Sequence, residues 1–337
     1  MTNYYGEQLR RLLLTDQPID LLVDLEPTKV FAKAVVDTSV LIFSEKQPGD
    51  LPETAVYQGT KDYKIVYKYD IAQDVWARDT EAVINLNASP SDIAILEKLA
   101  STTVLEKYID YSQGVILYKT KADGKENRYI SETSKGEAWL PLLESASQVK
   151  RYSVAEPKSF IHYGKWLWCE RETRYFSQPK ILFHRLRKKL PVQLVGAIDR
   201  SGVVNRHSSS NLILRLSVPD DMLDAILGLF NSTLANWWFV KRYGMLMEVG
   251  GFKIGKLPLP GTWEQSYEAL VPLVQTLTES NAKLSKTRLS QDRKFVERQI
   301  KSTDRQINQL VYKLYELTPE EIALVEGGSV PRPGEGD

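Results

Sequence analysis

Alternation of apolar and polar positions predicts a β-rich unit in the middle of the chain. Residues 181–183 (ILF) open an apolar run, residues 190–198 form a second run rich in branched side chains, and residues 211–216 alternate. Residues 199–202 (DRSG) have the composition of a turn. Branched and aromatic residues favour strands, and clusters of Asp, Ser and Gly separate them. We therefore predict strand, turn, strand, turn and strand across residues 179–216.

Helical spacing of apolar residues predicts helices after this unit. Three aspartates beside Pro219 suit the first turn of a helix over residues 222–240, because negative charge there meets the positive end of the helix dipole. Thr262 and Gln265 fit a capping box, which begins a helical region that runs to about residue 317. A stripe with a spacing of three to four residues is predicted to pack on a neighbour, and it consists of Val296, Ile300, Thr303, Ile307, Leu310 and Leu314.

The N-terminal pattern is incomplete as a folding unit. A leucine-rich helix is predicted over residues 1–14, and short hydrophobic strands are predicted over residues 19–25 and 35–43. One helix and two strands cannot bury their own apolar faces. Either another part of this chain or a partner protein must therefore complete the sheet.

These patterns predict an α+β fold that is divided along the chain. The segment at 48–110 is interpreted as a connection that contains a strand near residues 63–69 and a helix near residues 91–100. The predicted parts are a small α/β unit at 1–47, this connecting segment at 48–110, a mixed β-rich unit at 111–261, C-terminal helices at 262–326 and a tail of disordered composition at 327–337.

Positive charge is concentrated in the middle of the chain. The net charge of +1 becomes informative only when it is divided: residues 1–149 carry 16 Lys and Arg against 23 Asp and Glu, residues 150–256 carry 18 against 8, and residues 257–337 carry 10 against 12. A basic unit between two acidic ones indicates a polyanion partner. It also suits an internal interface with acidic protein surface, and both interpretations stay open.

Within the basic unit, cations lie beside short polar side chains, which is the combination that a surface needs to contact phosphates and read base edges. The residues predicted mainly to neutralise phosphates are Lys180, Lys188, Lys189, Lys241 and Lys253. The residues predicted to reach base edges, where Arg prefers guanine and Asn prefers adenine, are Arg185, Arg187, Arg206, His207, Ser208, Ser209 and Asn211. The candidate set is completed by His184, Arg242 and Tyr243. The alternative is a solvated basic edge strand, whose lysines prevent pairing between sheet edges.

Aromatic side chains offer a second kind of contact with nucleic acid. Trp166 and Trp168 occupy alternate positions, which predicts a strand. Aromatic rings can stack on bases, although most of those at these spacings are expected in the core. We expect one or two aromatic residues to contact a ligand, from a set that comprises Trp166, Trp168, Trp237, Trp238 and Phe239. Tyr243 and Phe252, each beside a cation, are better placed for contact than Trp237 in the predicted helix.

Several common functional sites find no support in the sequence. Residues 250–256 match G-x-x-x-x-G-K, but Leu257 and Pro258 follow where a phosphate-binding loop needs Ser or Thr and then a helix. The three histidines are far apart in sequence and Cys169 is the only cysteine, so neither a metal site nor an internal disulfide is indicated. No apolar run has the length of a signal-peptide core or a membrane span. The cytoplasm is therefore the expected compartment.

Three segments together resemble N6-adenine DNA methyltransferases of the TaqI-like class. Residues 19–43 (IDLLVDLEPTKVFAKAVVDTSVLIF) resemble the last two strands of the catalytic domain. Residues 227–260, with NSTLANWWF and GGFKIGKLPLP, resemble the end of the TaqI-like specificity domain. Residues 307–327 (INQLVYKLYELTPEEIALVEG) resemble the C-terminal end of type II restriction-modification proteins with fused methylase and recognition units. Residues 48–110 match only loosely.

The resemblance implies the tail of such an enzyme. These methyltransferases bind S-adenosylmethionine through a glycine-rich loop and hold a flipped adenine with an Asn/Asp-Pro-Pro-Tyr/Phe motif, and neither occurs in this sequence. The first unit then corresponds to a remnant of the catalytic domain and residues 111–261 to the target recognition domain. We expect duplex DNA and a methyltransferase domain or subunit as partners. We expect S-adenosylmethionine to be bound by that parent or partner rather than by this chain, which would not be catalytic alone.

Two other classes of function stay open. A protein-interaction subunit would dock a methylase or another partner through the acidic N-terminal unit and the helical stripe, with the basic unit paired to acidic protein surface. A free-standing nuclease would need clustered acidic or metal-binding residues, and no such motif is present in the sequence.

Overall fold

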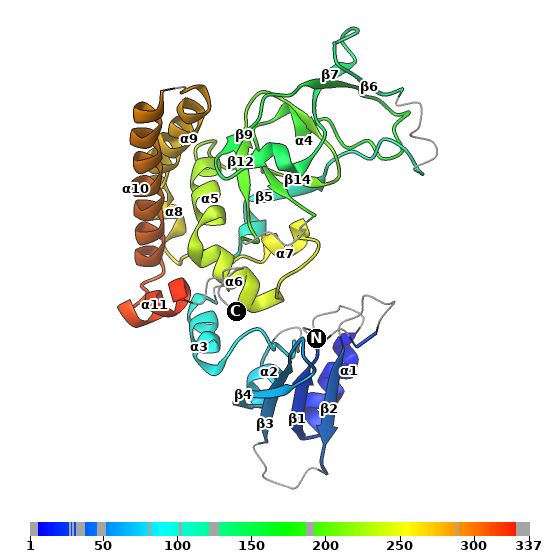
Figure 1. Cartoon of the computed structure of the whole chain (residues 1–337), viewed down its shortest axis with the longest axis vertical. Coiled ribbons are helices and arrows are strands. Elements are labelled where there is room, and N and C mark those ends of the chain that lie inside the picture. Colours follow the sequence, from blue (N-terminus) through cyan, green and yellow to red (C-terminus); the bar gives the residue numbers. More distant parts are fainter. Residues whose placement is uncertain are drawn as a thin grey trace. The chain divides into compact units, whose positions relative to one another are not determined.

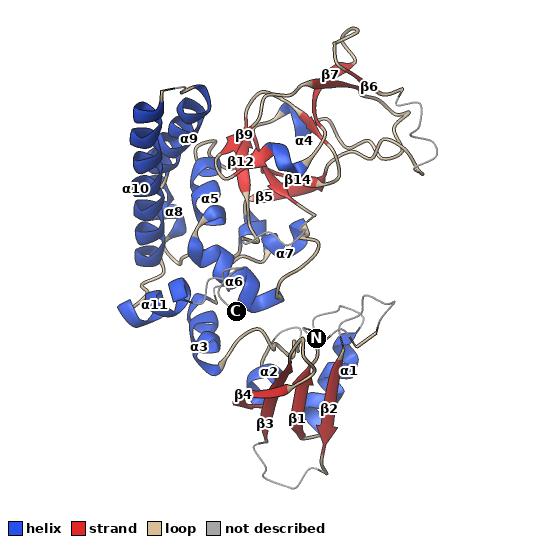
Figure 2. Ribbon diagram, in the orientation of Figure 1, coloured by secondary structure: helices blue, strands red, loops and turns tan. Residues whose placement is uncertain are grey.

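The computed structural model describes residues 6–26, 28, 30–31, 38–45, 52–79, 82–100, 103–120, 128–186, 192–287 and 289–327. The chain divides into two compact units. The first comprises residues 1–98 together with 241–244, and the second comprises residues 99–240 together with 245–337. Both units contain helices and strands (Figures 1 and 2), and the fold class is α+β as predicted.

The first unit is built on a four-stranded sheet. Its elements are α1 (Glu7–Asp16), β1 (Ile19–Asp24), β2 (Ser39–Phe43), β3 (Glu53–Gly59), β4 (Ile65–Ala72), α2 (Asp74–Ala77) and most of α3 (Pro90–Leu99). The strand order is β2-β1-β3-β4, in which β1 and β3 are parallel and the two outer pairs are antiparallel. Its core is formed by Leu14, Ile19, Leu22, Val56, Ile71, Trp76, Ala82 and Ile84.

The strands that complete the sheet of β1 and β2 come from this chain itself. β3 and β4 lie in the segment predicted as a connection, and they extend the sheet to four strands. Gln73 joins the two halves, because its Oε1 accepts a hydrogen bond from Ile19 N (2.8 Å) and its Nε2 donates one to Gln17 O (2.8 Å). The structure therefore groups residues 48–98 with the N-terminal strands, whereas the sequence pattern had separated them.

The described strands of the second unit form two four-stranded sheets and a two-stranded ribbon. One sheet has the order β12-β11-β14-β5, the other has the order β13-β7-β10-β6, and β8 pairs with β9. The strands are β5 (Ile109–Gln113), β6 (Ile130–Ser131), β7 (Trp139–Leu143), β8 (Val149–Lys150), β9 (Ser153–Val154), β10 (Ser159–His162), β11 (Lys180–His184), β12 (Gly196–Asp199), β13 (Val204–Asn205) and β14 (Ser209–Leu214). The short helix α4 (Arg174–Ser177) precedes β11.

Three strands are confirmed within the predicted range 179–216, although the second is shorter than the apolar run at 190–198, whose residues 192–195 are not strand and whose residues 190–191 lie outside the described residues. β11, β12 and β14 are neighbours in one antiparallel sheet, and β13 lies in the connection between β12 and β14. The strand predicted around Trp166 and Trp168 is wrong, because residues 164–168 form turns and bends. There the indole of Trp166 folds back, and its Nε1 donates a hydrogen bond to His162 O (2.8 Å).

Helices follow the strands of the second unit along the chain. They are α5 (Met222–Asn231), α6 (Thr233–Tyr243), α7 (Gly251–Gly255), α8 (Trp263–Ser266), α9 (Val271–Lys286), α10 (Ser290–Leu314) and α11 (Pro319–Gly327). α5 contacts β12 and also the α9–α10 pair, as Figure 1 shows. The predicted stripe on α10 therefore has its neighbours in this chain, with Val296, Thr303 and Ile307 buried. Residues 328–337 of the predicted tail lie outside the described residues.

The helix predicted over residues 222–240 is two helices that meet at Ser232. The backbone of Ser232 is extended (φ −63°, ψ 156°), which ends α5. Its Oγ then accepts a hydrogen bond from Ala235 N (3.1 Å) and caps α6. Serine is a favoured cap because its short hydroxyl satisfies an otherwise unpaired N–H of the first turn. The break places the asparagine side chains of the NSTLAN segment beside the sheet.

Two of these asparagines pair with the backbone next to the edge strand β12. Asn231 Oδ1 accepts a hydrogen bond from Gly196 N (2.9 Å), and its Nδ2 donates one to Gly196 O (3.0 Å). Asn236 binds Leu194 in the same way, with distances of 2.7 Å to N and 3.3 Å to O. Each amide thus supplies the donor and the acceptor that a further strand would supply, which satisfies backbone groups that would otherwise be buried unpaired.

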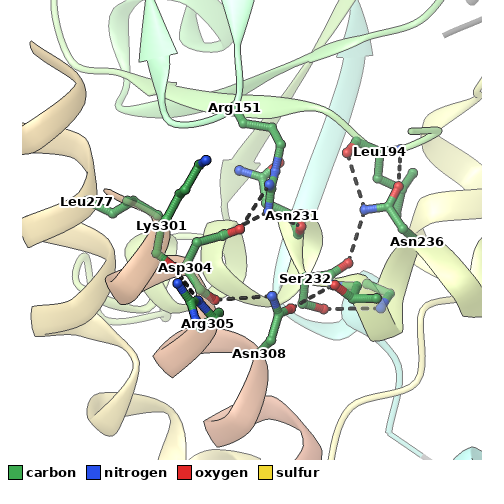
Figure 3. Close-up of polar contacts among 12 residues, drawn as sticks. Arg151, Leu194, Asn231, Ser232, Asn236, Leu277, Lys301, Asp304, Arg305 and Asn308 are labelled. Carbon is green, nitrogen blue, oxygen red and sulfur yellow. Dashed lines mark hydrogen bonds and ion pairs between the residues drawn. The ribbon is translucent and has the colours of Figure 1, made fainter. Parts of the chain in front are cut away.

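Charged and polar side chains extend this junction to α10 (Figure 3). Arg151 Nη2 donates hydrogen bonds to Asn231 O (2.8 Å) and to Asp304 Oδ1 (2.8 Å). Asn308 Oδ1 accepts a hydrogen bond from Thr233 N (2.8 Å) at the start of α6. One network therefore ties the β8–β9 turn, the α5–α6 break and α10 together.

Replacing Asn231 with Ala should destabilise the second unit by about 1–3 kcal/mol, because Gly196 N–H is then buried without its acceptor. Urea unfolding followed by circular dichroism measures this change. Asn281 makes a single side-chain bond within α9, to Leu277 O, and Asn281→Ala serves as the matched control. Equal stability losses in the two variants would contradict the role assigned to Asn231.

Candidate nucleic-acid interface

Three of the predicted residues come together where β11 ends. Arg185 follows β11, and Arg206 and His207 lie in the turn between β13 and β14. Arg185 N donates a hydrogen bond to Ser208 O (3.0 Å), and Arg185 Nη1 donates one to His207 O (2.9 Å). We call Arg185, Arg206 and His207 the arginine–histidine node.

Glu248 completes the node from a distant part of the sequence. Its carboxylate forms an ion pair with Arg185 Nη2 (2.6 Å), and Val249 N donates a hydrogen bond to Arg185 O (2.8 Å). The carboxylate is about half exposed, whereas the Arg185 side chain is mostly buried. Sequence reasoning missed Glu248, because nothing in the sequence indicates that residue 248 lies beside residue 185.

The electrostatics of the node keep its histidine neutral. Burial, followed by the charges of Arg206 and Arg185, lowers the pKa of His207 below its ordinary value of 6.5. A third positive charge beside two guanidinium groups is unfavourable. At neutral pH the node therefore presents two permanent cations and a neutral imidazole, with the Glu248 carboxylate at one side.

Exposed apolar side chains lie close in sequence to Arg185 and Glu248. Leu186 forms a β-bridge with Glu248, and both Leu186 and Met247 are exposed. Phe252 on α7 is also exposed, with Lys253 Nζ 5.8 Å from the centre of its ring. Lys253, a predicted phosphate contact, lies within α7. Arg187, Lys188 and Lys189 directly follow Leu186 but lie outside the described residues.

Four predicted contacts are corrected because they point between the sheets. In the antiparallel pairing of β11 with β14, Leu182 lies opposite Asn211 and His184 lies opposite Ser209, so these four residues share one face of the sheet with Lys180. Leu182 belongs to the buried core on that face. The corrected residues are Lys180 and Asn211, both 0% exposed, His184, 9% exposed, and Ser209, 1% exposed.

Three of the four corrected side chains have an internal partner, whereas the buried side-chain amide of Asn211 has no hydrogen-bond partner among the described residues. Lys180 Nζ forms an ion pair with Asp199 and donates a hydrogen bond to Phe176 O (3.0 Å). His184 Nε2 lies 2.6 Å from Val149 O. The Oγ of Ser209 accepts a hydrogen bond from Asn205 Nδ2 (3.0 Å). These side chains stabilise the sheets and cannot reach phosphates or base edges from this conformation.

Lys241 and Arg242 belong to the first unit rather than to the node. Lys241 Nζ forms an ion pair with Asp92 (2.8 Å), and Arg242 Nη1 forms one with Asp79. Both side chains are largely buried by these contacts. Tyr243 follows them in the same segment. Acidic residues of the N-terminal segment thus neutralise part of the basic charge counted at 150–256.

Ser208 does lie at the node, and its Oγ accepts a hydrogen bond from Ala146 N (3.1 Å).

The described residues contain no group of three or more His, Cys, Asp or Glu side chains that could hold a metal ion. Among the helices of the described part, none is long and apolar enough to cross a membrane.

The node lies inside a segment with a recognisable family. Residues 140–259 match the family model of the TaqI-like C-terminal specificity domain. This segment is therefore similar to TaqI-like C-terminal specificity domains. The resemblance seen in the sequence is confirmed for these residues, which contain Arg185, Arg206, His207 and Glu248.

Solved structures extend the likeness beyond the specificity domain. The type IIL restriction-modification enzyme MmeI in complex with DNA is 12% identical, with a TM-score of 0.57 over 96% of this chain and 47% of that chain. The type IIG restriction endonuclease BpuSI is 10% identical, with a TM-score of 0.40 over 93% of this chain and 46% of that one. The HsdS subunit from Thermoanaerobacter tengcongensis is 11% identical, with a TM-score of 0.34 over 67% and 50%.

At these sequence identities the likeness concerns the fold alone, and it rests on MmeI, for which the TM-score is above 0.5. The chain spans about half the length of each of these solved proteins. A comparison with curated proteins finds no match.

Replacing Lys180 with Met should lower the free energy of unfolding by about 3–5 kcal/mol, because Asp199 then stays buried without its cation. Thermal or urea unfolding measures the loss. Lys158 is exposed, and Lys158→Met should change stability by no more than about 0.5 kcal/mol. A Lys180→Met protein as stable as Lys158→Met would restore Lys180 to the candidate interface.

Proposed function

We propose that this chain recognises duplex DNA in a sequence-specific manner, as the specificity part of a restriction-modification adenine methyltransferase. The observation that carries the proposal is the position of the arginine–histidine node within the TaqI-like specificity domain. A cation pair beside a carboxylate and exposed apolar groups can contact phosphates, base edges and thymine methyl groups.

The chemistry of the node suits direct readout of G·C pairs. Arginine binds the O6 and N7 of guanine with two hydrogen bonds, and glutamate accepts a hydrogen bond from the N4 of cytosine. The ion pair between Arg185 and Glu248 holds both groups at one point of the surface. Arg206 is partly exposed in the adjoining turn and supplies a second guanidinium. These residues replace the larger candidate set as the proposed reading group.

A methyltransferase domain or subunit is the proposed protein partner, and the first unit offers a surface for it. Val40, Tyr57 and Tyr67 lie on one face of the sheet. Val40 in β2 lies opposite Val23 in β1, which lies opposite Tyr57 in β3, and Tyr57 lies opposite Tyr67 in β4. Val40 and Tyr67 are exposed, and so is Ile42 in the same strand as Val40. Exposed apolar faces of this kind indicate an interaction site.

In this proposal the partner supplies the chemistry. It binds S-adenosylmethionine and flips the adenine, which requires a duplex held in fixed register. This chain, which we place in the cytoplasm, holds the duplex in that fixed register. The alternative, a protein-interaction subunit, predicts no affinity for random duplex at low salt, and a gel-shift experiment separates the two.

Replacing Arg206 with Ala should reduce discrimination between a duplex selected from a random pool and random duplex by about 1–3 kcal/mol, if Arg206 makes one good base contact. Fluorescence anisotropy titrations with both duplexes measure the ratio. Wild-type affinity should also fall with salt, with a logarithmic slope of about −0.9 for each phosphate contacted. A flat salt response would reject the proposed function.

Replacing Glu248 with Gln should strengthen binding to random duplex at low salt, because it removes a negative charge from a surface that meets phosphates. Glu297 is also an exposed carboxylate paired with an arginine, Arg293, but it lies on α10. Glu297→Gln therefore changes the net charge equally and is the matched control. An identical gain in both variants would mean that net charge, and not the node, governs DNA affinity.

A further inference from the structure

Two exposed tryptophans lie in the turn that follows β10, outside the node. Trp166 is 46% exposed and Trp168 is 52% exposed. Leu167 between them is buried in the core, which anchors the turn that carries both indoles. Tryptophan is among the residues that gain most from burial, so two that remain half exposed in one turn indicate an interaction site.

Trp166 is the third ring of a cluster in which Trp139 and His162 are stacked and Trp166 is tilted by 35° from His162. The rings of Trp139 and His162 lie 5.2 Å apart and are nearly parallel (9°), and the rings of His162 and Trp166 lie 4.1 Å apart. The hydrogen bond from Trp166 Nε1 to His162 O fixes the indole. A Cβ atom on Gly164 would lie 2.4 Å from the Trp166 ring, so the indole rests directly on a glycine backbone.

The stack lies on the outer face of its sheet. In the pairing of β10 with β7, His162 lies opposite Trp139, and the neighbouring pair of Ile161 and Leu140 points to the other face. Ile161 is fully buried in the core there. We call Trp139, His162, Trp166 and Trp168 the tryptophan surface.

Two lysines lie over these indoles. Lys119 Nζ is 5.0 Å from the centre of the Trp168 ring, and Lys135 Nζ is 5.1 Å from the centre of the Trp139 ring. An aromatic ring beside a flexible cation matches the two parts of a nucleotide, since the base stacks on the ring and the phosphate meets the ammonium group. A purely apolar protein partner would leave these ammonium groups without a counter-charge.

The tryptophan surface is continuous with the node through the backbone. Arg206 forms a β-bridge with Val115, and the next residue, Ile116, forms one with Cys169. Adjacent strands lie about 5 Å apart, so Cys169 lies roughly 10 Å from Arg206. The turn that carries Trp166 and Trp168 therefore adjoins the backbone of the node.

We propose that the tryptophan surface binds an unstacked nucleobase of the DNA, with Lys119 and Lys135 at the flanking phosphates; this inference rests on the proposed function. An indole can cover the face of a base only where that base has left the duplex stack. Base flipping by a partner opens the stack. The tryptophan surface then stabilises the opened strand while the node keeps hold of the intact duplex.

The test compares the full chain with a Trp166→Ala/Trp168→Ala double variant on oligo-thymidylate and on intact duplex. The double variant should bind oligo-thymidylate roughly 5–150-fold more weakly for each base that stacks, and it should bind intact duplex nearly as well as the wild type. A Trp166→Phe/Trp168→Phe variant should keep the affinity for oligo-thymidylate and lose the tryptophan quenching that accompanies binding. Thermal unfolding confirms that each variant is folded.

Phe295→Ala is the matched control, because Phe295 is an exposed aromatic residue on α10, and its binding should equal that of the wild type. Unchanged affinity of the double Ala variant for oligo-thymidylate, or an equal loss in Phe295→Ala, would overturn the inference. A wild-type chain that binds intact duplex but not oligo-thymidylate would overturn it as well while leaving the proposed function standing. Failure of the wild type to bind intact duplex would reject the proposed function itself.

Discussion

The arrangement of the second unit depends on one constraint: the backbone N–H and C=O groups at the edge strand β12, which is buried against helices, need hydrogen-bond partners. The amides of Asn231 and Asn236 pair with the N and O atoms of residues 196 and 194. They reach this edge only because Ser232 ends α5 and caps α6. Once β12 is held, β11 has a fixed position, and Arg185 at its end meets the turn that carries Arg206 and His207. The node is thus positioned by a junction in which none of its own residues takes part.

Internal ion pairs decide which cations remain for a ligand. Lys180 is neutralised by Asp199, Lys241 by Asp92 and Arg242 by Asp79. Leaving any of these charges buried without its partner would cost several kcal/mol. The basic charge of residues 150–256 is therefore partly structural. The cations of the proposed reading group are fewer: Arg206 is partly exposed, and Arg185 is oriented by Glu248.

Much of the fold could be predicted from the sequence, because alternation and turn residues are local signals. They correctly indicated β11, β12 and β14 and the buried stripe of α10. The site was harder to predict, because strand register decides which side of a sheet each residue faces. The pairing of Leu182 with Asn211 places Ser209 and Asn211 on the face of Leu182, and a register shifted by one residue would have placed them on the other face. Lys180 shares that face because it lies two residues before Leu182 in the same strand. Glu248 and the His162–Trp166 stack depend on contacts between distant or turning segments, for which the sequence carries no periodic signal.

Backbone hydrogen exchange of the full chain, with and without duplex DNA, tests the central claim most directly. The amides of Arg185 and Val249 bond to Ser208 O and Arg185 O, and they report on the node itself. The account predicts that duplex slows exchange at residues 185, 206–208 and 249. Unchanged exchange at these residues in the presence of bound duplex would contradict the assignment of the arginine–histidine node as the DNA-reading surface.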